Sequence, residues 1–290
     1  MGEEVGDDAA DDGLFGPASA TWELHTDPMI GPAGLRALVL QALHPLAMHV
    51  VAQHSTFKQE TWQRLQRTGE YVDATTFGST RTAHRAAARV RGIHARIRGT
   101  DPDTGLEYRA DDEDLLLWIH CALVDSILDV VSRSRPPRDA VSDETADRYV
   151  AEQVVAAELV GVRPEVVPAS RADLAAYFEE VRPHLRVTRE AREAATYVVA
   201  PPMEPRVLLT TPAAPVWFGV ASAAVASLPG WARRMYALPQ LPGTGASVEA
   251  ATTATLRALR LALVRSAGKV PGVEQSEHRK RAVRRLAEAS

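Results

Sequence analysis

The sequence contains a single cysteine, Cys121, so the chain has no second thiol with which to form an internal disulfide. It contains no Glu-x-x-His pair, the ligand motif of ferritin-like di-iron bundles, and this absence disfavours that class of helical metalloprotein. No run of alternating apolar and polar residues indicates a sheet of several strands. No repeat at a solenoid period is present either. The chain does not open with a charged segment followed by an apolar stretch, so we expect a cytoplasmic protein.

The charges exclude one class of partner and define one segment. A net charge of −4 over 290 residues gives no case for nucleic-acid binding by the chain as a whole. The first thirteen residues have no basic side chain and six acidic ones, which are Glu3, Glu4, Asp7, Asp8, Asp11 and Asp12. Such a composition is typical of disorder. We therefore predict a disordered acidic lead over residues 1–20, with order beginning near Trp22.

One long stretch, Leu208 to Trp231, lacks charged side chains altogether. Prolines at 212, 215 and 229 shorten its helical part to about 13 residues, fewer than the roughly 20 that a membrane span needs. We therefore expect a buried helix or a pocket wall here, and no transmembrane span.

The remaining pattern predicts an all-α fold with a single helical bundle-like domain over residues 21–290, because apolar-periodic segments alternate with Pro and Gly breaks. Hydrophobic residues make up 46% of the chain, enough for a sizeable core. Leu115 to Val130 is apolar nearly all round, so this helix should be central. Further helices are predicted at 143–160, ended by Gly161, and at 171–181, ended before Pro183. Residues 100–108 read as a turn or short hairpin.

Pro45 lies inside the apolar run that follows Leu35, and its missing N–H should bend the helix and leave the Gln41 carbonyl free. The bend can turn His44 inward. His44, His49 and His54 are five residues apart, so a helix cannot place all three in one row. Core or capping roles for His44 and His54, with His49 exposed, are the competing interpretation.

A second histidine lies in an arginine-rich segment. If residues 80–98 are helical, Val90, Ile93, His94 and Ile97 form one apolar stripe. Arg91 precedes His94 by three residues and Arg98 follows it by four, so both can flank the imidazole. This arrangement suits a ligand with carboxylates, and haem is one that fits. The alternative is a core histidine that donates to a backbone carbonyl, with both arginines in solvent.

Arg64, Arg67 and Thr68 stand at i, i+3 and i+4, so a helix presents all three on one face. Guanidinium N–H groups and a threonine hydroxyl can bind an anion there. The alternative is a solvated basic face, with Thr68 bonding back to its own helix. His120 and Cys121, inside the apolar segment 115–130, are expected to be core residues.

Five blocks in a fixed order carry a family resemblance. They are H-P-L-A-M-H-V-V-A-Q-H-S (44–55), R-L-Q-R-T-G-E-Y-V (64–72), F-G-S (77–79), I-H-A-R-I-R-G (93–99) and L-L-L-W-I-H-C-A-L-V-D-S (115–126). Together they resemble the haem-dependent oxygenase family that includes latex-clearing protein, the rubber oxygenase, and the mycophenolic-acid-pathway oxygenase. A later segment, L-P-G-W-A-R-R-M-Y-A-L-P (228–239), resembles a C-terminal part of the same family.

The resemblance implies a haem b-dependent oxygenase that uses dioxygen on a small, apolar, alkene-containing or isoprenoid substrate. It implies a helical domain that encloses the haem, with the haem-binding core at about 31–130. His94 matches the family's proximal iron ligand, and Arg64, Arg67 and Thr68 match its distal R-x-x-K-T motif. His44 is a further distal candidate. The lone cysteine excludes the C-x-x-C-H attachment, so the haem would be held without covalent links.

The chain departs from the family pattern at two points. Arg67 stands where latex-clearing protein has a lysine, and a guanidinium stays protonated, so it is a poor iron ligand. No acid matches the family's proposed catalytic base, since Glu60 is the nearest and its spacing is wrong. A non-catalytic haem carrier or sensor, and a metal-free helical ligand-binding regulator, are the alternative functions.

Overall fold

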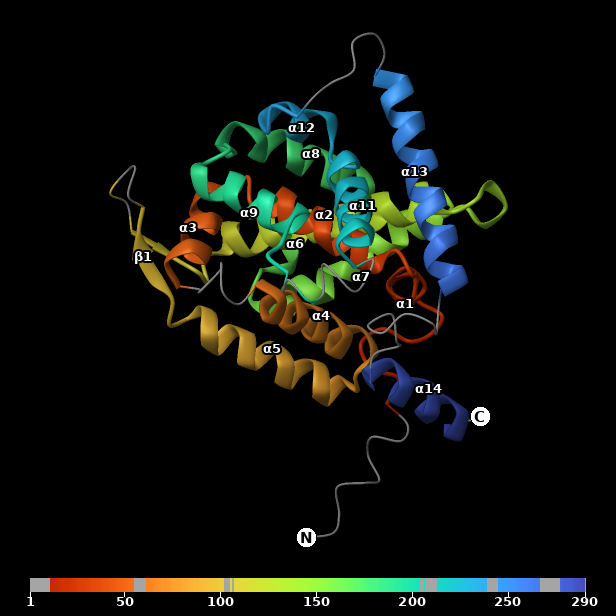
Figure 1. Cartoon of the computed structure of the whole chain (residues 1–290). Coiled ribbons are helices and arrows are strands. Elements are labelled where there is room, and N and C mark those ends of the chain that lie inside the picture. The colour runs from red at the N-terminus through yellow and green to blue at the C-terminus, as the bar shows by residue number, and fades with distance from the viewer. Residues whose placement is uncertain are drawn as a thin grey trace.

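The structure is a computed structural model that describes residues 11–54, 61–101, 105, 107–203, 206, 213–238, 245–266 and 277–289. Within these residues it contains thirteen α-helices and one two-stranded sheet (Figure 1). The prediction of an all-α fold is therefore confirmed.

The first half of the chain holds six helices and both strands: α1 Ala20–His25, α2 Ile30–Gln41, α3 Pro45–His54, α4 Thr61–Phe77, α5 Thr80–His94, β1 Arg98–Thr100, β2 Glu107–Arg109 and α6 Glu113–Ser134. The second half is helical: α7 Asp143–Val160, α8 Arg171–Val181, α9 Arg189–Val199, α11 Ala213–Ala226, α12 Gly230–Met235, α13 Gly245–Ser266 and α14 Glu277–Ala289. Three short 3₁₀ turns lie between helices: η1 Pro137–Asp139, η2 Pro164–Val166 and η3 Arg182–His184.

Helix α6 is the centre of the molecule, as its sequence predicts. It packs against α2, α7 and α13, and Trp118, Ile127 and Val130 on it are fully buried. Helix α6 is long and apolar enough to cross a membrane, and so are α2 and α3 if the bent pair is taken as one segment. In the apolar stretch of α6, 61% of the residues are buried inside the protein, and a central core helix can have the same length and composition.

The chain bends by 108° between α2 and α3, at the expected position before Pro45. The Gln41 carbonyl is not left free, however. It accepts a hydrogen bond of 2.9 Å from the indole Nε1 of Trp118, and the Gln41 side-chain amide donates to the carbonyl of Ile119. The bend thus ties α2 to α6, because a buried carbonyl released by proline must find another donor.

Helix α5 ends at His94, four residues before the end considered from the sequence. Arg98 lies in β1, paired with Arg109 of β2 across an antiparallel hairpin, as the turn at 100–108 indicates. The buried side of α5 consists of Ala83 and Ala87, where small side chains allow α4 to pack closely. The predicted apolar stripe is therefore not a core face: Ile93 is 50% exposed, and His94 is half-buried.

The chain is described from Asp11 onward. Ser19 caps α1, so the first helix begins two residues before Trp22, and Phe15 is already buried at 3% exposure. Of the predicted acidic lead, residues 1–10 lie outside the described part of the chain. In the uncharged stretch, α11 has 14 residues, close to the expected length, and residues 207–212 lie outside the described part.

Candidate functional site

Helices α4 and α5 form an antiparallel hairpin that brings two predicted motifs to the same end. The two helices pack along one another and are joined only by Gly78 and Ser79, as Figure 1 shows. Going back along α4 and forward along α5, the residues Arg67, Thr68, Arg91 and His94 all lie toward the end opposite this turn. The hairpin thus places the two motifs, about 25 residues apart in sequence, on neighbouring helices.

His94 is the last residue of α5. Its Nδ1 atom is buried, while the side chain as a whole is half-buried. Its carbonyl accepts from the amide of Ile97, and this turn leads directly into β1. The neighbouring Ile93 exposes half of its apolar surface, so the end of α5 presents an imidazole next to an apolar side chain. An imidazole nitrogen and an apolar surface are two of the contacts that a haem makes with a protein.

The two arginines expected to flank His94 occupy different environments. The Arg91 guanidinium donates to the carbonyl of Leu159 at the end of α7, and its stem lies near Gly161. Arg98 is exposed on the first strand, where the helical i+4 relation to His94 does not apply. Arg91 is thereby held at the contact between α5 and α7. Arg98 faces solvent on β1, so it does not flank His94 in the way that a continuous helix would allow.

The distal motif is helical, as predicted, and two of its three residues can be described. Arg67 and Thr68 are exposed on the first half of α4. The side chain of Arg64 lies outside the described residues, and so does the segment that precedes α4. These exposed donors face the solvent side of the α4–α5 hairpin rather than the core.

His44 lies elsewhere, between α6 and the η3 segment. Burial, followed by the charge of His184, lowers the pKa of His44 to about 4, and its ring packs against Trp118 with centroids 6.2 Å apart. Its Nδ1 atom is buried and meets no hydrogen-bond partner among the described residues. A neutral imidazole with an unpaired nitrogen is the form that ligates metals. None of these neighbours of His44 comes from α4 or α5, so the structure does not join it to His94.

His49 is buried, whereas the competing interpretation of the sequence placed it at the surface. It is 5% exposed, and its Nε2 lies 3.4 Å from Oδ1 of Asp101, which is also buried. His120 is half-buried on α6, and burial lowers its pKa to about 4. Cys121 is buried, and burial raises the pKa of its thiol. The side chain of His54 lies outside the described residues.

The contact of His49 belongs to a cluster between α3 and the β-hairpin that sequence reasoning missed. The Tyr108 hydroxyl donates to Oε1 of Gln53 at 2.8 Å, and a Cβ on Gly99 would stand 2.4 Å from that hydroxyl. Glycine is therefore required at position 99. The only sequence signal was Gly99 itself, at the end of the I-H-A-R-I-R-G block. The cluster holds the strand that follows His94 against α3.

A cavity of about 590 Å³ lies apart from the predicted site. The described residues that line it belong to α9 and the segment before it, and they are Val187, Arg189, Arg192, Glu193, Thr196 and Tyr197. None of the predicted site residues that the structure describes contributes to it. The predicted motifs lie on α4 and α5, whereas the described lining of the cavity comes from α9 and the segment before it. The candidate site is therefore the α4–α5 hairpin.

Two observations bear on whether the residues present fit a haem. Haem iron needs only one or two protein ligands, and the buried imidazole Nδ1 atoms of His94 and His44 are donors of that kind. In the described part of the chain no group of three or more His, Cys, Asp or Glu is placed to hold a metal ion. His94, which follows the half-exposed apolar Ile93, therefore offers the kind of donor that haem iron takes.

The comparisons with known proteins agree with the sequence blocks. The sequence model of the family described as "ER-bound oxygenase mpaB/B'/Rubber oxygenase, catalytic domain" matches residues 22–263. Neither the curated proteins nor the solved structures gave a significant match. Because the family match spans most of the chain, including α1 to α9 and α11 to most of α13, this protein belongs to the mpaB and rubber oxygenase family.

Proposed function

We propose that this protein is a haem b-dependent oxygenase that acts with dioxygen on a small apolar substrate containing an alkene, such as an isoprenoid. The support comes from the family, whose members are oxygenases, and from one structural observation. His94 ends α5 at the same end of the α4–α5 hairpin as Arg67 and Thr68, beside the half-exposed Ile93. A cytoplasmic location goes with this proposal as an expectation from the sequence.

In this proposal His94 would hold the iron, and Arg91 and Arg98 would neutralise the carboxylates of the bound group. Haem, when bound, supplies the activation of dioxygen. The chain's own task at His94 is to keep the imidazole neutral and oriented, and the turn from His94 to Ile97 and the hairpin cluster hold the backbone on its C-terminal side. Arg91 needs to exchange its bond to the Leu159 carbonyl for a carboxylate, which is the better acceptor for a guanidinium.

The roles on α4 follow from donor chemistry. Arg67 and Thr68 carry N–H and O–H donors, so they can orient a ligand that develops negative charge, and Arg64 shares their helical face. Arg67 does not become a ligand itself because it stays protonated. His44, a neutral imidazole packed on Trp118 and apart from His94, stays in the proposal as the distal-pocket candidate of the sequence and would be a nitrogen donor to the bound group.

Haem titration tests the proposal. The purified chain should bind hemin at a 1:1 ratio and show a Soret band, and His94→Ala should lose most of this binding. The matched control is His84→Ala, because His84 is an exposed histidine on the same helix. Full binding and an unchanged spectrum in His94→Ala would assign the iron to another histidine, His44 or His120.

Oxygen uptake then separates the candidate functions. An oxygenase should consume oxygen in the presence of an isoprenoid alkene such as squalene. A Soret band without substrate-dependent uptake would indicate a haem carrier or sensor instead. No haem binding by the native chain would contradict the proposal and favour a metal-free ligand-binding regulator.

A further inference from the structure

The outer face of α5 is a row of arginines. Arg81, Arg85 and Arg89 are four residues apart and exposed, so they lie on one side of the helix, which we call the arginine stripe. Neither Arg85 nor Arg89 has a hydrogen bond or ion pair with another described residue. Residues 80–100 include six arginines and no acidic residue. The charges of Arg85 and Arg89 on this side of α5 therefore have no counter-ion among the described residues.

The start of the described chain is fixed beside the first turn of α5. The Asp11 carboxylate accepts hydrogen bonds from the backbone N–H of Thr80 at 2.7 Å and from its hydroxyl at 2.8 Å. Gly13, at φ +78°, lies so close to Gly78 that a Cβ would stand 2.3 Å from the Gly78 carbonyl oxygen. Only glycine allows this approach. The acidic lead is thus tethered at the N-terminal end of the arginine stripe.

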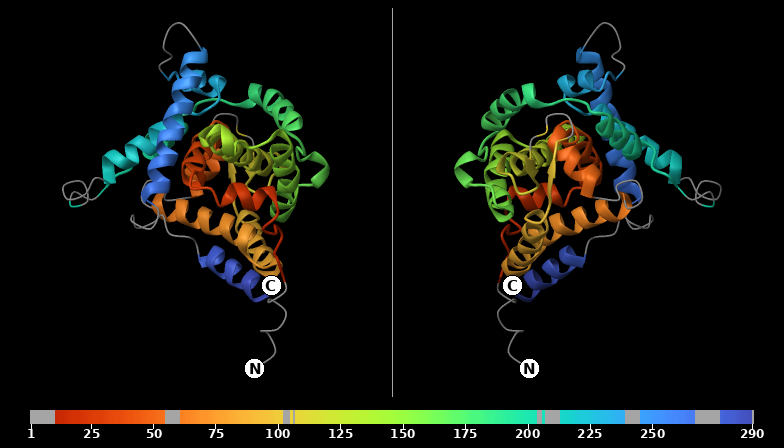
Figure 2. Two further views of the ribbon diagram at one scale, coloured as in Figure 1. Left: turned by 90° about the vertical axis from the view of Figure 1, so that its right-hand side faces the viewer. Right: turned by 90° about the vertical axis from the view of Figure 1, so that its left-hand side faces the viewer.

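Electrostatics at the tether already favour ionised acids. Burial opposes ionisation of Asp11, but hydrogen bonds from Thr80 and Gly13 and the charge of Arg285 outweigh it and lower the pKa of this carboxyl. Arg285 belongs to α14, which packs on α4 next to the same turn. Figures 1 and 2 show α5 and α14 on the same side of the molecule. The lead therefore starts between two basic helices.

Length and charge match between the lead and the arginine stripe. The eight residues from Glu3 to Ala10 reach up to about 28 Å when extended. Helix α5, with 15 residues, is about 22 Å long, so the lead can cover all of it. Glu3, Glu4, Asp7 and Asp8 supply four negative charges on this length. A tether that short keeps the carboxylates close to the guanidinium groups, so that several individually weak ion pairs can act together.

We propose that residues 3–10 of the acidic lead bind along the arginine stripe of α5 as an intramolecular electrostatic cover. The contact is between carboxylates and exposed guanidinium groups, so it weakens as salt screens the charges. The cover occupies the outer side of the same helix that ends in His94, and an external polyanion must displace it to reach α5. This inference does not depend on haem binding or on catalysis.

Zero-length carbodiimide cross-linking tests the proposal, because it joins carboxylates to lysines in direct contact. The chain has only three lysines, Lys58, Lys269 and Lys280, and none on α5. In the full chain, Arg85→Lys and Arg89→Lys place a reactive amine in the stripe and keep its charge. The matched control is Arg138→Lys, since the Arg138 side chain is 85% exposed on η1, away from the stripe. Peptide mass spectrometry locates the cross-links, and circular dichroism checks each fold.

We expect cross-links from residues 3–8 to the introduced amines of the stripe at about five times the yield seen in the Arg138→Lys control. The yield should fall at least about threefold from 0.05 to 0.5 M salt, because the Debye length shrinks from about 14 to about 4 Å. Equal yields at the stripe and the control would overturn the proposal. So would cross-links found only in covalent dimers, which would assign the stripe to a second molecule.

Discussion

At the scale of single residues, burial keeps three histidines of this protein in their neutral form at pH 7. Burial lowers the pKa of His25 to about 4, and the same holds for His44 and His120. His25 is held between Thr76 and Tyr149, with its Nδ1 2.8 Å from the threonine hydroxyl and its Nε2 3.2 Å from the tyrosine hydroxyl. This bonding fixes α1 to α4 and α7, and burial favours the uncharged ring.

The sign of the pH effect follows from these shifts. In the unfolded chain a histidine binds a proton below pH 6.5, whereas folded His25 resists it until about pH 4, so stability is full above pH 6.5 and is lost as pH falls. Between pH 7 and 5 this histidine should cost roughly 2 kcal/mol of unfolding free energy. In His25→Gln, urea unfolding at the two pH values should show a drop smaller by about that amount. An unchanged drop would contradict the assigned neutrality of His25.

Thr68 allows a test of the distal face that separates binding from turnover. If its hydroxyl orients an oxygen-derived ligand, Thr68→Ala should leave haem content near normal and lower oxygen-dependent turnover by roughly 3- to 10-fold, the loss expected for one hydrogen bond of about 1 kcal/mol. Arg64→Ala should lower turnover more, because a charge-assisted bond is stronger. Gln66→Ala, on the same exposed helix turn, is the control. Parallel losses of haem and turnover would instead make these residues anchors of the cofactor.

At the scale of elements, the hairpin after α5 is positioned by one glycine. The backbone of Gly99 lies under the ring of Tyr108, and an added Cβ would stand 2.4 Å from its hydroxyl and 3.0 Å from Gln53 Oε1. Tyr108 is 2% exposed and hydrogen-bonded, so its ring has little freedom to move away. The strand, the tyrosine and α3 therefore form one fitted contact.

Gly99→Ala should destabilise the protein by about 1–3 kcal/mol, the usual cost of overpacking. Gly92→Ala is a matched control, because Gly92 lies in α5 with open space around its Cα, so alanine should be neutral or stabilise by up to about 1 kcal/mol. Urea unfolding of both variants measures the difference. If Gly99→Ala proved as stable as Gly92→Ala, the contact with Tyr108 would not be tight in solution.

Helix boundaries were the part of the fold that the sequence predicted best, since they are set by neighbouring residues. Ser142 and Gly161 cap α7, and Ser170 begins α8, where local rules place them. The buried pair His49 and Asp101 could not be predicted in this way. Its members are 52 residues apart, and only the packing of the β-hairpin on α3 brings them together. For the same reason, the end of α5 at His94 depends on β1 and not on helical periodicity.

In the candidate site too, the features set by neighbouring residues could be predicted and the contacts between distant residues could not. The motif residues Arg67, Thr68 and His94 could be placed on helices from spacing, and the antiparallel α4–α5 hairpin then put them at one end. The partner of Arg91, the carbonyl of Leu159, belongs to a distant helix and left no local signal. The roles of these residues toward haem remain predictions for the titration described above.

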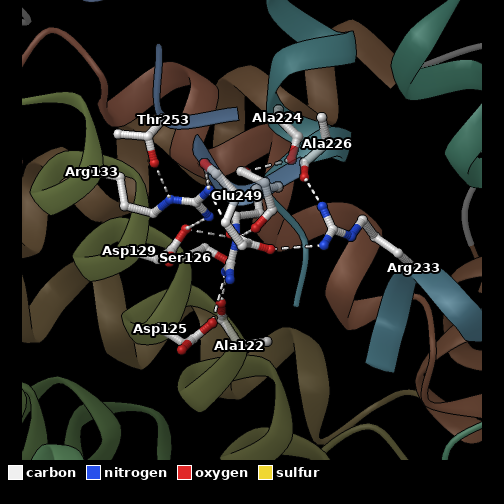
Figure 3. Close-up of polar contacts among 12 residues, drawn as sticks. Ala122, Asp125, Ser126, Asp129, Arg133, Ala224, Ala226, Arg233, Glu249 and Thr253 are labelled. Carbon is white, nitrogen blue, oxygen red and sulfur yellow. Dashed lines mark hydrogen bonds and ion pairs between the residues drawn. The ribbon is translucent and has the colours of Figure 1, made fainter. Parts of the chain in front are cut away.

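At the scale of the whole molecule, a buried charge network joins the two halves of the chain. Arg36 of α2 is 2% exposed, and it donates to Asp125 at 2.8 Å and lies 3.7 Å from Asp129, both on α6. Arg133, also on α6, pairs with Asp129 and with Glu249 of α13, and Glu249 pairs in turn with Arg233 of α12 (Figure 3). Arg36 also donates to the carbonyl of Ser227, just after α11.

In this network, burial and the neighbouring opposite charges shift the pKa values in opposite directions. Burial raises the pKa of Asp129, although Arg36 and Arg133 oppose the shift. For Arg36 burial acts against the charged form, but Asp125 and Asp129 outweigh it and raise its pKa. Asp129 thus depends on Arg36 and Arg133 for its ionised state. The C-terminal helices depend on the same cluster for their attachment to α2 and α6.

Arg36→Met should therefore destabilise the protein by roughly 3 kcal/mol at pH 7, because it leaves two carboxylates near the core without their cation. We take the lower end of the range for buried pairs, since the side chains of Asp125 and Asp129 are each 28% exposed. The loss should shrink as the pH falls toward 4, where Asp129 with its raised pKa takes up a proton and no longer needs a partner. The control is Arg163→Met, which removes the pair with Glu113 from a side chain that is 69% exposed and should cost less than about 1 kcal/mol. Urea unfolding of both variants across this pH range gives the comparison. Equal losses in the two variants, or a loss in Arg36→Met that does not change with pH, would mean that packing of the arginine stem rather than its charge holds the two halves together.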